Sequence, residues 1–244
     1  MENFLAFDCS GQKLSVLLKT GEKKYINIRE VGLHHSEKLM PLINSMCNEA
    51  GISSSMLELI ACPKGPGSFT GLRIAMATAK GLSLALNIPL VCVATTSYLA
   101  LKAPSDYIVI PFIDAKKNRY YASLFYDGRE LTPPLDISIE NLLPQILSHA
   151  KKENCNKIFL TSEDAKKALT EIQTKLSQME TKQQEMYKDL EFILDLRYDY
   201  CGIESLLELA VKTYKKEGPT PLECSPLYLR KSEAEENFIS CKEN

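Results

Sequence analysis

The sequence lacks several features that would assign it to a class of protein at once. Its eight cysteines contain no Cys-x-x-Cys pair, and their scatter fits reduced thiols better than a disulfide framework. No apolar run approaches the ~20 residues that a membrane span needs. The N-terminus has no basic region followed by a long apolar stretch, so we expect no signal peptide and a cytoplasmic protein.

Paired histidines and a basic surplus are also missing. The three histidines, His34, His35 and His149, include no pair spaced to place two imidazoles on one helical face, so no metal site is predicted. The net charge is −2 and the isoelectric point is about 6.0. Such a chain has no basic field that would hold a nucleic acid alone, so another subunit would have to supply most phosphate contacts.

The 244 residues are otherwise ordinary for a globular protein, with 45% apolar and 25% charged residues. Alternating patterns predict an opening three-stranded meander, and periods near 3.6 predict helices over 35–50 and 70–86. A second unit is expected to begin near Ser105, which divides the chain into lobes 1–104 and 105–244. The last helix, from Ile203, is a candidate for packing back on the first lobe.

The region 165–190 has a distinct pattern. Apolar residues recur there at alternating spacings of four and three in a polar background, which predicts one long heptad-like helix. Two interpretations stay open. The helix lies on its own domain, or it forms a protruding arm for a partner.

The stretch CPKGPGSFTGLRIAMATAKGLSLAL, residues 62–86, is the most informative one. It is not a Walker loop, because Leu72 follows the last glycine where a lysine is needed. It is not a nucleophile elbow, because Ser68 directly follows Gly67. It predicts a strand-to-helix turn in which Gly65 and Gly67 supply unusual dihedrals and a hydroxyl caps the helix. The helix that follows is rich in small residues, which suit the core or a partner.

This stretch resembles the signature of the TsaB family, also called YeaZ. Similar matches are FLAFDCS at the N-terminus, HSEKLMPLI, IPLVCVAT, FIDAKKNRYYASLF and PLYLR, whereas about 164–199 carries no clear match. The resemblance implies an α/β protein of the actin/hexokinase-like (ASKHA) class. Its two lobes would contain mixed sheets flanked by helices, and the C-terminal lobe would be degenerate.

The resemblance also implies a function. Proteins of this family are non-catalytic partners in forming the threonylcarbamoyl group on N6 of the adenosine beside the anticodon of tRNAs. The implied partners are a TsaD-like catalytic paralogue and a TsaE-like ATPase, with tRNA engaged indirectly. Because paralogous surfaces can self-pair, we expect a homodimer through the helices over 35–50 and 70–86 when the partner is absent. This chain alone is expected to bind no cofactor, whereas the complex needs ATP and a metal on the partner subunit.

Family members pair through the helices that match 35–50 and 70–86. The predicted partner interface therefore comprises His35, Leu39, Ile43, Met46, Arg73, Met76, Ala77 and Lys80. Arg73 lies in the first turn of its helix, where a cation is mildly unfavourable, which favours an anion such as a partner carboxylate beside it. The basic and aromatic residues over 116–121 favour a solvated turn with edge packing over direct contact with RNA.

Asp8, Ser10 and Gly11 resemble the first phosphate loop of actin-like folds, but the sequence has no Gly-Gly adenosine loop, so this loop is expected to be vestigial. TsaD-like subunits carry His-x-x-x-His after a similar strand, and the matching positions here are Thr95 and Leu99, which cannot replace imidazole. We therefore expect neither catalytic residues nor metal ligands. The alternatives are an actin-fold ATP-dependent phosphotransferase, an M22-like metallopeptidase, or a regulatory protein unrelated to tRNA.

Overall fold

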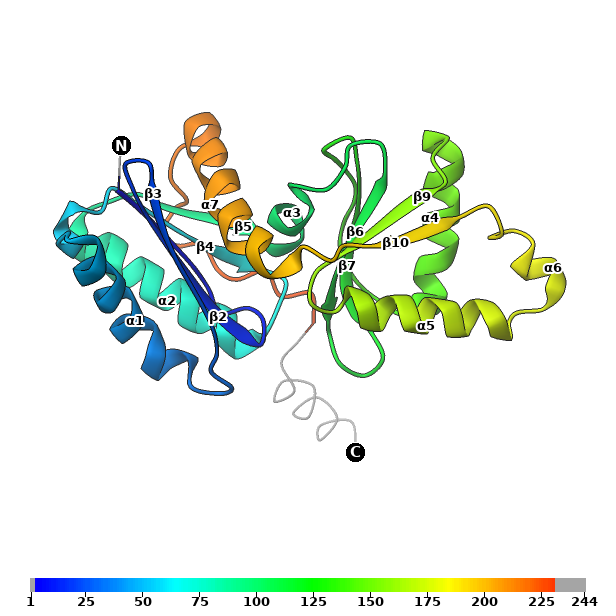
Figure 1. Ribbon diagram of the computed structural model, residues 1–244, viewed down its shortest axis with the longest axis horizontal. Coiled ribbons are helices and arrows are strands. Elements are labelled where there is room, and N and C mark those ends of the chain that lie inside the picture. The colour runs from blue at the N-terminus through cyan, green and yellow to red at the C-terminus, as the bar shows by residue number, and fades with distance from the viewer. Residues whose placement is uncertain (1–2, 231–244) are drawn as a thin grey trace.

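The structure is a computed structural model that describes residues 3–230, without the side chains of 198–201. Two five-stranded mixed sheets form two lobes that lie side by side (Figure 1). The first sheet has the order β3-β2-β1-β4-β5. Its strands are β1 (Asn3–Asp8), β2 (Lys13–Thr20), β3 (Lys23–Glu30), β4 (Leu59–Gly65) and β5 (Leu90–Ala94).

The second sheet has the order β10-β9-β6-β7-β8. Its strands are β6 (Ile108–Asp114), β7 (Tyr120–Tyr126), β8 (Arg129–Ile137), β9 (Lys157–Thr161) and β10 (Glu191–Leu194). In each lobe the first strand is central, two antiparallel strands follow on one side, and two parallel strands lie on the other. The predicted actin/hexokinase-like class is confirmed. The C-terminal lobe was expected to be degenerate, but its sheet has as many strands as the first sheet and the same arrangement.

Helices cover both faces of the first sheet. On one face lie α1 (His35–Ala50) and α2 (Phe69–Leu86), and on the other lie α3 (Thr95–Ala100) and α7 (Tyr198–Glu217) (Figure 1). The short 3-10 helix η1 (Ser54–Met56) precedes β4. Although α7 follows the last strand of the second lobe, its buried residues pack on strands of the first sheet.

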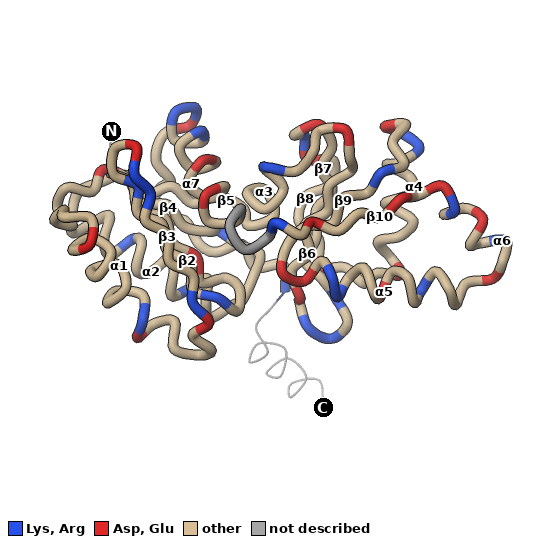
Figure 2. The backbone as a smooth tube through the Cα atoms, in the orientation of Figure 1, with Lys and Arg blue, Asp and Glu red and all other residues tan. Residues whose placement is uncertain are grey.

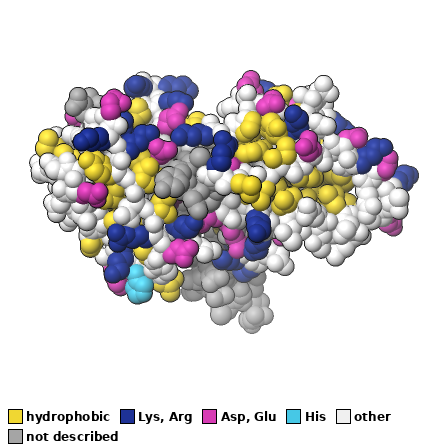
Figure 3. Space-filling model, in the orientation of Figure 1, with side chains coloured by type: hydrophobic (Ala, Val, Ile, Leu, Met, Phe, Trp, Pro, Cys, Tyr) yellow, Lys and Arg dark blue, Asp and Glu magenta, His cyan; other side chains and the backbone are white. Residues whose placement is uncertain are grey.

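The second sheet is covered on one face by α4 (Ile139–Glu153) and α5 (Ala165–Gln178). Its other face carries a smaller apolar cluster built on Val109, Phe125 and Phe159. Figure 3 shows hydrophobic side chains gathered over this sheet. Within the described part of the chain, no helix has the length and apolar character needed to cross a membrane.

The prediction of one long helix over 165–190 is wrong. The helix α5 ends at Gln178, Met179 is extended, and a single turn, α6 (Thr181–Gln184), follows. The Gln184 side-chain amide donates to the carbonyls of Ser177 at 3.3 Å and Met179 at 3.0 Å, which satisfies orphan carbonyls at the end of α5. The chain then folds back, and its apolar residues pack on the second-lobe core.

Candidate functional site

The Gly-Pro-Gly turn packs directly on the turn between β1 and β2. The Ser68 backbone N–H donates to the Ser10 carbonyl at 2.8 Å. A Cβ on Gly71 would lie 1.8 Å from the Cys9 carbonyl oxygen, and one on Gly67 would lie 2.8 Å from Ser10 Cβ. Close backbone approach is therefore why this turn needs glycine, and the contact surface of the turn is protein rather than phosphate.

The predicted dihedrals hold for one of the two glycines. Gly65 has a φ of 110°, in the region that favours glycine, whereas Gly67 has no positive φ and is required for its contact with Ser10. The hydroxyl that caps α2 is that of Ser68, whose Oγ accepts the Gly71 backbone N–H at 3.2 Å.

The Asp8 carboxylate is occupied by the protein itself. It accepts the Ser10 backbone N–H at 2.6 Å and the Tyr98 hydroxyl. Asp8 thus joins the end of β1 to α3 as a turn residue, and Ser10 is buried beside it. Both carboxylate oxygens therefore accept a hydrogen bond from the protein itself.

A small cavity lies next to this loop, between the lobes. Its volume is about 40 Å³, and Asp8, Gly11, Lys13, Tyr98 and Glu163 are among its lining residues. Lys13 Nζ of the first lobe lies 3.4 Å from Glu163 Oε1 of the second lobe, and this ion pair links the two lobes beside the cavity. Sites for ligands of nucleotide size occupy about 300 Å³ or more. This cavity is therefore much smaller than a site for a nucleotide.

The positions that match the TsaD-type histidines hold packing residues. The Thr95 side chain is 2% exposed, and Leu99 packs against the cluster formed with α7. Among the described residues, no three His, Cys, Asp or Glu side chains lie together in a way that could hold a metal ion.

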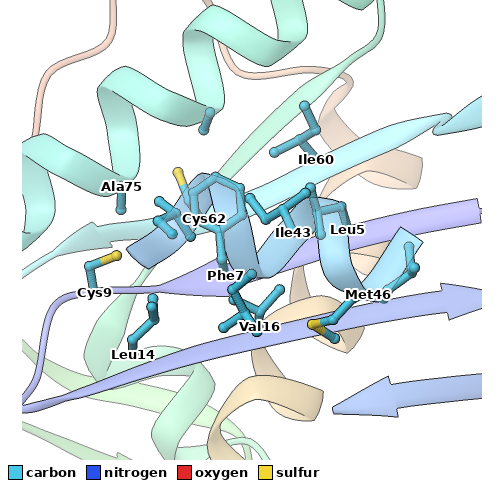
Figure 4. Packing of buried hydrophobic residues seen from close by; sticks show 14 of the residues in the cluster. Leu5, Phe7, Cys9, Leu14, Val16, Ile43, Met46, Ile60, Cys62 and Ala75 are labelled. Atoms are coloured by element: carbon cyan, nitrogen blue, oxygen red, sulfur yellow. The ribbon is translucent and has the colours of Figure 1, made fainter. Parts of the chain in front are cut away.

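Four of the eight predicted interface residues lie in the core of the first lobe, so their assignment to a partner surface is wrong. Leu39 and Ile43 are 1% exposed, and Met46 and Met76 are 3% exposed. Figure 4 shows Ile43 and Met46 among the buried side chains of this lobe. The physical reason is that the apolar stripe of each helix covers its own sheet and leaves the opposite face for any partner.

The other four predicted residues differ from one another. Arg73 and Ala77 are exposed, Lys80 is half-buried, and His35 is buried at 8% exposure with no hydrogen-bond partner for its Nε2 among the described residues. The outward face of α2, which we call the α2 face, is formed by Thr70, Arg73, Ala77, Gly81, Leu84 and Ala85. Leu84 on this face is 65% exposed.

Arg73 is held by aromatic side chains of its own chain, and a partner carboxylate beside it stays a prediction. Its guanidinium lies 3.9 Å from the centre of the Phe69 ring, and its Nε donates to the Tyr228 hydroxyl at 2.9 Å. The two rings contact each other with centroids 4.8 Å apart. Stacking of the cation on these rings offsets its unfavourable place in the first helical turn.

Tyr228 belongs to residues 219–230, which we call the C-terminal segment. Thr220 N–H donates to the Leu90 carbonyl at 2.8 Å, and Leu227 N–H donates to the Lys64 carbonyl at 2.7 Å. Arg230 then binds Asp136 of the second lobe, with Nη2 and Oδ2 2.8 Å apart. The segment therefore fastens both lobes together.

The loop between β6 and β7 carries basic residues (Figure 2) and is a solvated turn with packed ends. Lys116 is exposed and pairs with Asp114, whereas Arg119 Nε lies 2.7 Å from Asp136 Oδ1. Tyr120 is 1% exposed and donates its hydroxyl to Glu171. Most of these side chains are engaged with the protein itself, as expected of edge packing.

Comparisons with known proteins agree over most of the chain. The model of the family described as TsaD, tRNA N6-adenosine threonylcarbamoyltransferase, matches residues 27–238. The Bacillus subtilis protein named tRNA threonylcarbamoyladenosine biosynthesis protein TsaB is 33% identical over 125 residues, 50% of this chain and 54% of that protein. Its Escherichia coli namesake is 28% identical over 120 residues, 48% and 52% of the two chains. The chain spans about half the length of the curated relatives it matches.

Solved structures show the same fold. YeaZ from Pseudomonas aeruginosa aligns with a TM-score of 0.67 at 21% identity, over 94% of this chain and 100% of that one. A further Pseudomonas aeruginosa protein, described as uncharacterized with similarity to peptidase YEAZ, aligns with a TM-score of 0.70 at 23% identity, with the same coverage.

Proposed function

This chain belongs to the TsaB (YeaZ) family, within the larger family of TsaD-type proteins, and from that premise we propose that it is an accessory subunit in threonylcarbamoyl-adenosine formation on tRNA. In this proposal it binds and activates a TsaD-like catalytic subunit, together with a TsaE-like ATPase. The catalytic subunit supplies the metal and carries out the transfer.

The α2 face is the observation that carries the proposal. Ala77, Gly81 and Ala85 follow one another at four-residue spacing on the exposed side of the helix. A Cβ on Gly81 would have no atom within 4 Å, so no other part of the described chain covers this point. A helix side without bulky residues lets the ridges of a second helix approach closely.

The two ends of the α2 face add the kind of anchors that interfaces use. Leu84, 65% exposed, offers an apolar contact near the C-terminal end of the helix. Arg73 and Tyr228 lie at the N-terminal end, with the Tyr228 side chain held against the arginine. Arginine and tyrosine are enriched among residues that dominate binding energy, and a pre-ordered pair loses less entropy on binding.

The binding test is substitution of Ala77 by arginine, which places a long cation in the middle of the α2 face. We expect the variant to keep the wild-type melting temperature within about 2 °C, because surface changes are usually within ~0.5 kcal/mol. Its affinity for the TsaD-like subunit, measured by calorimetry, should fall at least tenfold. Gln173→Arg, an exposed position on α5, is the matched control and should bind like wild type.

The functional test is mass spectrometry of tRNA nucleosides from cells depleted of this protein. Threonylcarbamoyl-adenosine should disappear and return with the wild type or Gln173→Arg, but not with Ala77→Arg. Depleted cells that keep the modification would overturn the function. Full binding by Ala77→Arg would instead overturn only the place of the interface.

A further inference from the structure

Three cysteines from distant parts of the sequence meet beside the edge strand of the first sheet. Cys62 lies in β4, Cys92 faces it across the ladder in β5, and Cys224 lies in the C-terminal segment. The sulfurs of Cys62 and Cys92 are 3.6 Å apart. Cys224 packs against the cluster that contains both, and its sulfur lies 4.0 Å from Met76 Sδ. The C-terminal segment also bonds Cys92 directly, because the Cys92 backbone N–H donates to the Thr220 hydroxyl at 2.9 Å. All three are free thiols in this structure.

Cys92 differs from the other two cysteines in the direction of its pKa shift. The hydrogen bond between the Cys62 and Cys92 thiols lowers the pKa of Cys92, whereas burial raises it. Hydrogen bonds with Cys224 and Thr220 and the positive charge of Lys80 lower this pKa further. The pKa values of Cys62 and Cys224 are raised, so Cys92 is the member of the cluster whose pKa shift favours the thiolate.

The surroundings also distinguish the two possible partners of Cys92. Cys62 is fully buried in β4, a strand with a neighbouring strand on each side. Cys224 is half-buried and follows a turn closed by its own N–H on the Pro221 carbonyl, outside regular structure. A disulfide needs its sulfurs about 2.05 Å apart with a restricted dihedral angle, so one partner must move. The irregular segment moves at lower cost than the ladder.

We propose that Cys92 and Cys224 are a redox modification site, which peroxide-class oxidants convert into a disulfide that fastens the C-terminal segment to β5. The Cys92 thiolate attacks one oxygen of hydrogen peroxide, giving a sulfenic acid and hydroxide. The Cys224 thiol then attacks the sulfenic sulfur, an S–S bond forms, and the sulfenic oxygen leaves as water. Together the two thiols lose two electrons and two protons, and one peroxide becomes two waters.

The modification acts on the segment that joins the lobes. Thr220 and Leu227 hold this segment on the first sheet, and Arg230 holds it on the second lobe. A covalent bond at Cys224, between these anchors, prevents the segment from leaving the sheet while the protein is oxidised. This inference goes beyond the proposed function and does not depend on it.

The test uses the full chain treated with hydrogen peroxide and then alkylated with N-ethylmaleimide. Intact mass should show one disulfide, and a non-reducing peptide map should join the peptides of Cys92 and Cys224. The melting temperature should rise by about 5 °C or more, because the bond closes a long loop in the unfolded chain. Dithiothreitol should reverse both changes.

Matched variants make the outcome decisive. Cys224→Ser should abolish the cross-link, whereas Cys155→Ser, which changes a buried thiol of the second lobe, should leave it intact. A map that joins Cys62 to Cys92, a cross-link that survives Cys224→Ser, or oxidation to sulfinic acid without any cross-link would each overturn the proposal.

Discussion

Replacement of Gly71 by alanine tests the idea that the Gly-Pro-Gly turn is a packing device. The added Cβ would lie 1.8 Å from the Cys9 carbonyl oxygen and 2.9 Å from the Cys9 carbonyl carbon. Backbone atoms cannot swing away as a flexible side chain can, so the start of α2 must move off the β1–β2 turn. Such overpacking costs about 1–3 kcal/mol. Loss of the Ser68–Ser10 backbone hydrogen bond adds about 1 kcal/mol.

We therefore expect Gly71→Ala to lower the free energy of unfolding by about 3 kcal/mol, which is about 6–12 °C in melting temperature for a chain of this size. Gly81→Ala in the same helix is the control, because its Cβ would meet no atom within 4 Å. Alanine there should stabilise the helix by about 1 kcal/mol. Urea unfolding followed by circular dichroism measures both. If Gly71→Ala unfolds like the wild type, the close approach of the two turns is refuted.

Three further predictions concern single contacts. Ser68→Ala removes the cap of α2 and should cost about 1 kcal/mol in urea unfolding, and Ser68→Asp should restore most of it. Asp136→Asn weakens the ion pair with Arg230 and should cost about 1–3 kcal/mol, with earlier proteolysis of the C-terminal segment; equal protease resistance would contradict this. The hydrogen bond from Lys24 lowers the pKa of Glu204 in the folded protein. The ionised Glu204 therefore stabilises the fold above about pH 4.3, the usual pKa of the unfolded chain, and this stabilisation is lost as pH falls through the lower pKa of the folded state. Glu204→Gln should thus be about 0.5 kcal/mol less stable at pH 7 and equal to wild type near pH 3, and a difference that grows in acid would refute the assignment.

The sequence patterns predicted most elements of the fold because those elements have strong local signals. The helix predicted over 35–50 is α1, which ends at Gly51 in a left-handed conformation with a φ of 69°. The strand β8 was not predicted, since Pro133 and Pro134 interrupt its pattern. An edge position in the sheet tolerates such prolines. The prediction of one helix over 165–190 failed for a different reason. The apolar spacing continues through two segments, α5 and the chain after it, which fold back and pack on the same core.

The predicted partner surface shows what periodicity along one helix cannot predict. Periodicity identified Met76 and Ala77 as neighbours on one helix, but it did not say which of them faces the sheet. The structure places Met76 against the first-lobe core and Ala77 outside. The glycines of the turn were recognised from sequence, yet the reason for Gly67 and Gly71 is contact with Cys9 and Ser10, some sixty residues away in the chain.

By itself, the sequence determined the order and kind of most elements, the need for glycine in one turn, and the resemblance to a family. Tertiary structure alone decided that both lobes have the same strand order, that the C-terminal segment joins them, and that Cys62, Cys92 and Cys224 share one site. The physical reason is that periodicity reports whether a side chain is buried, whereas the identity of what buries it depends on hydrogen bonds and packing between distant segments.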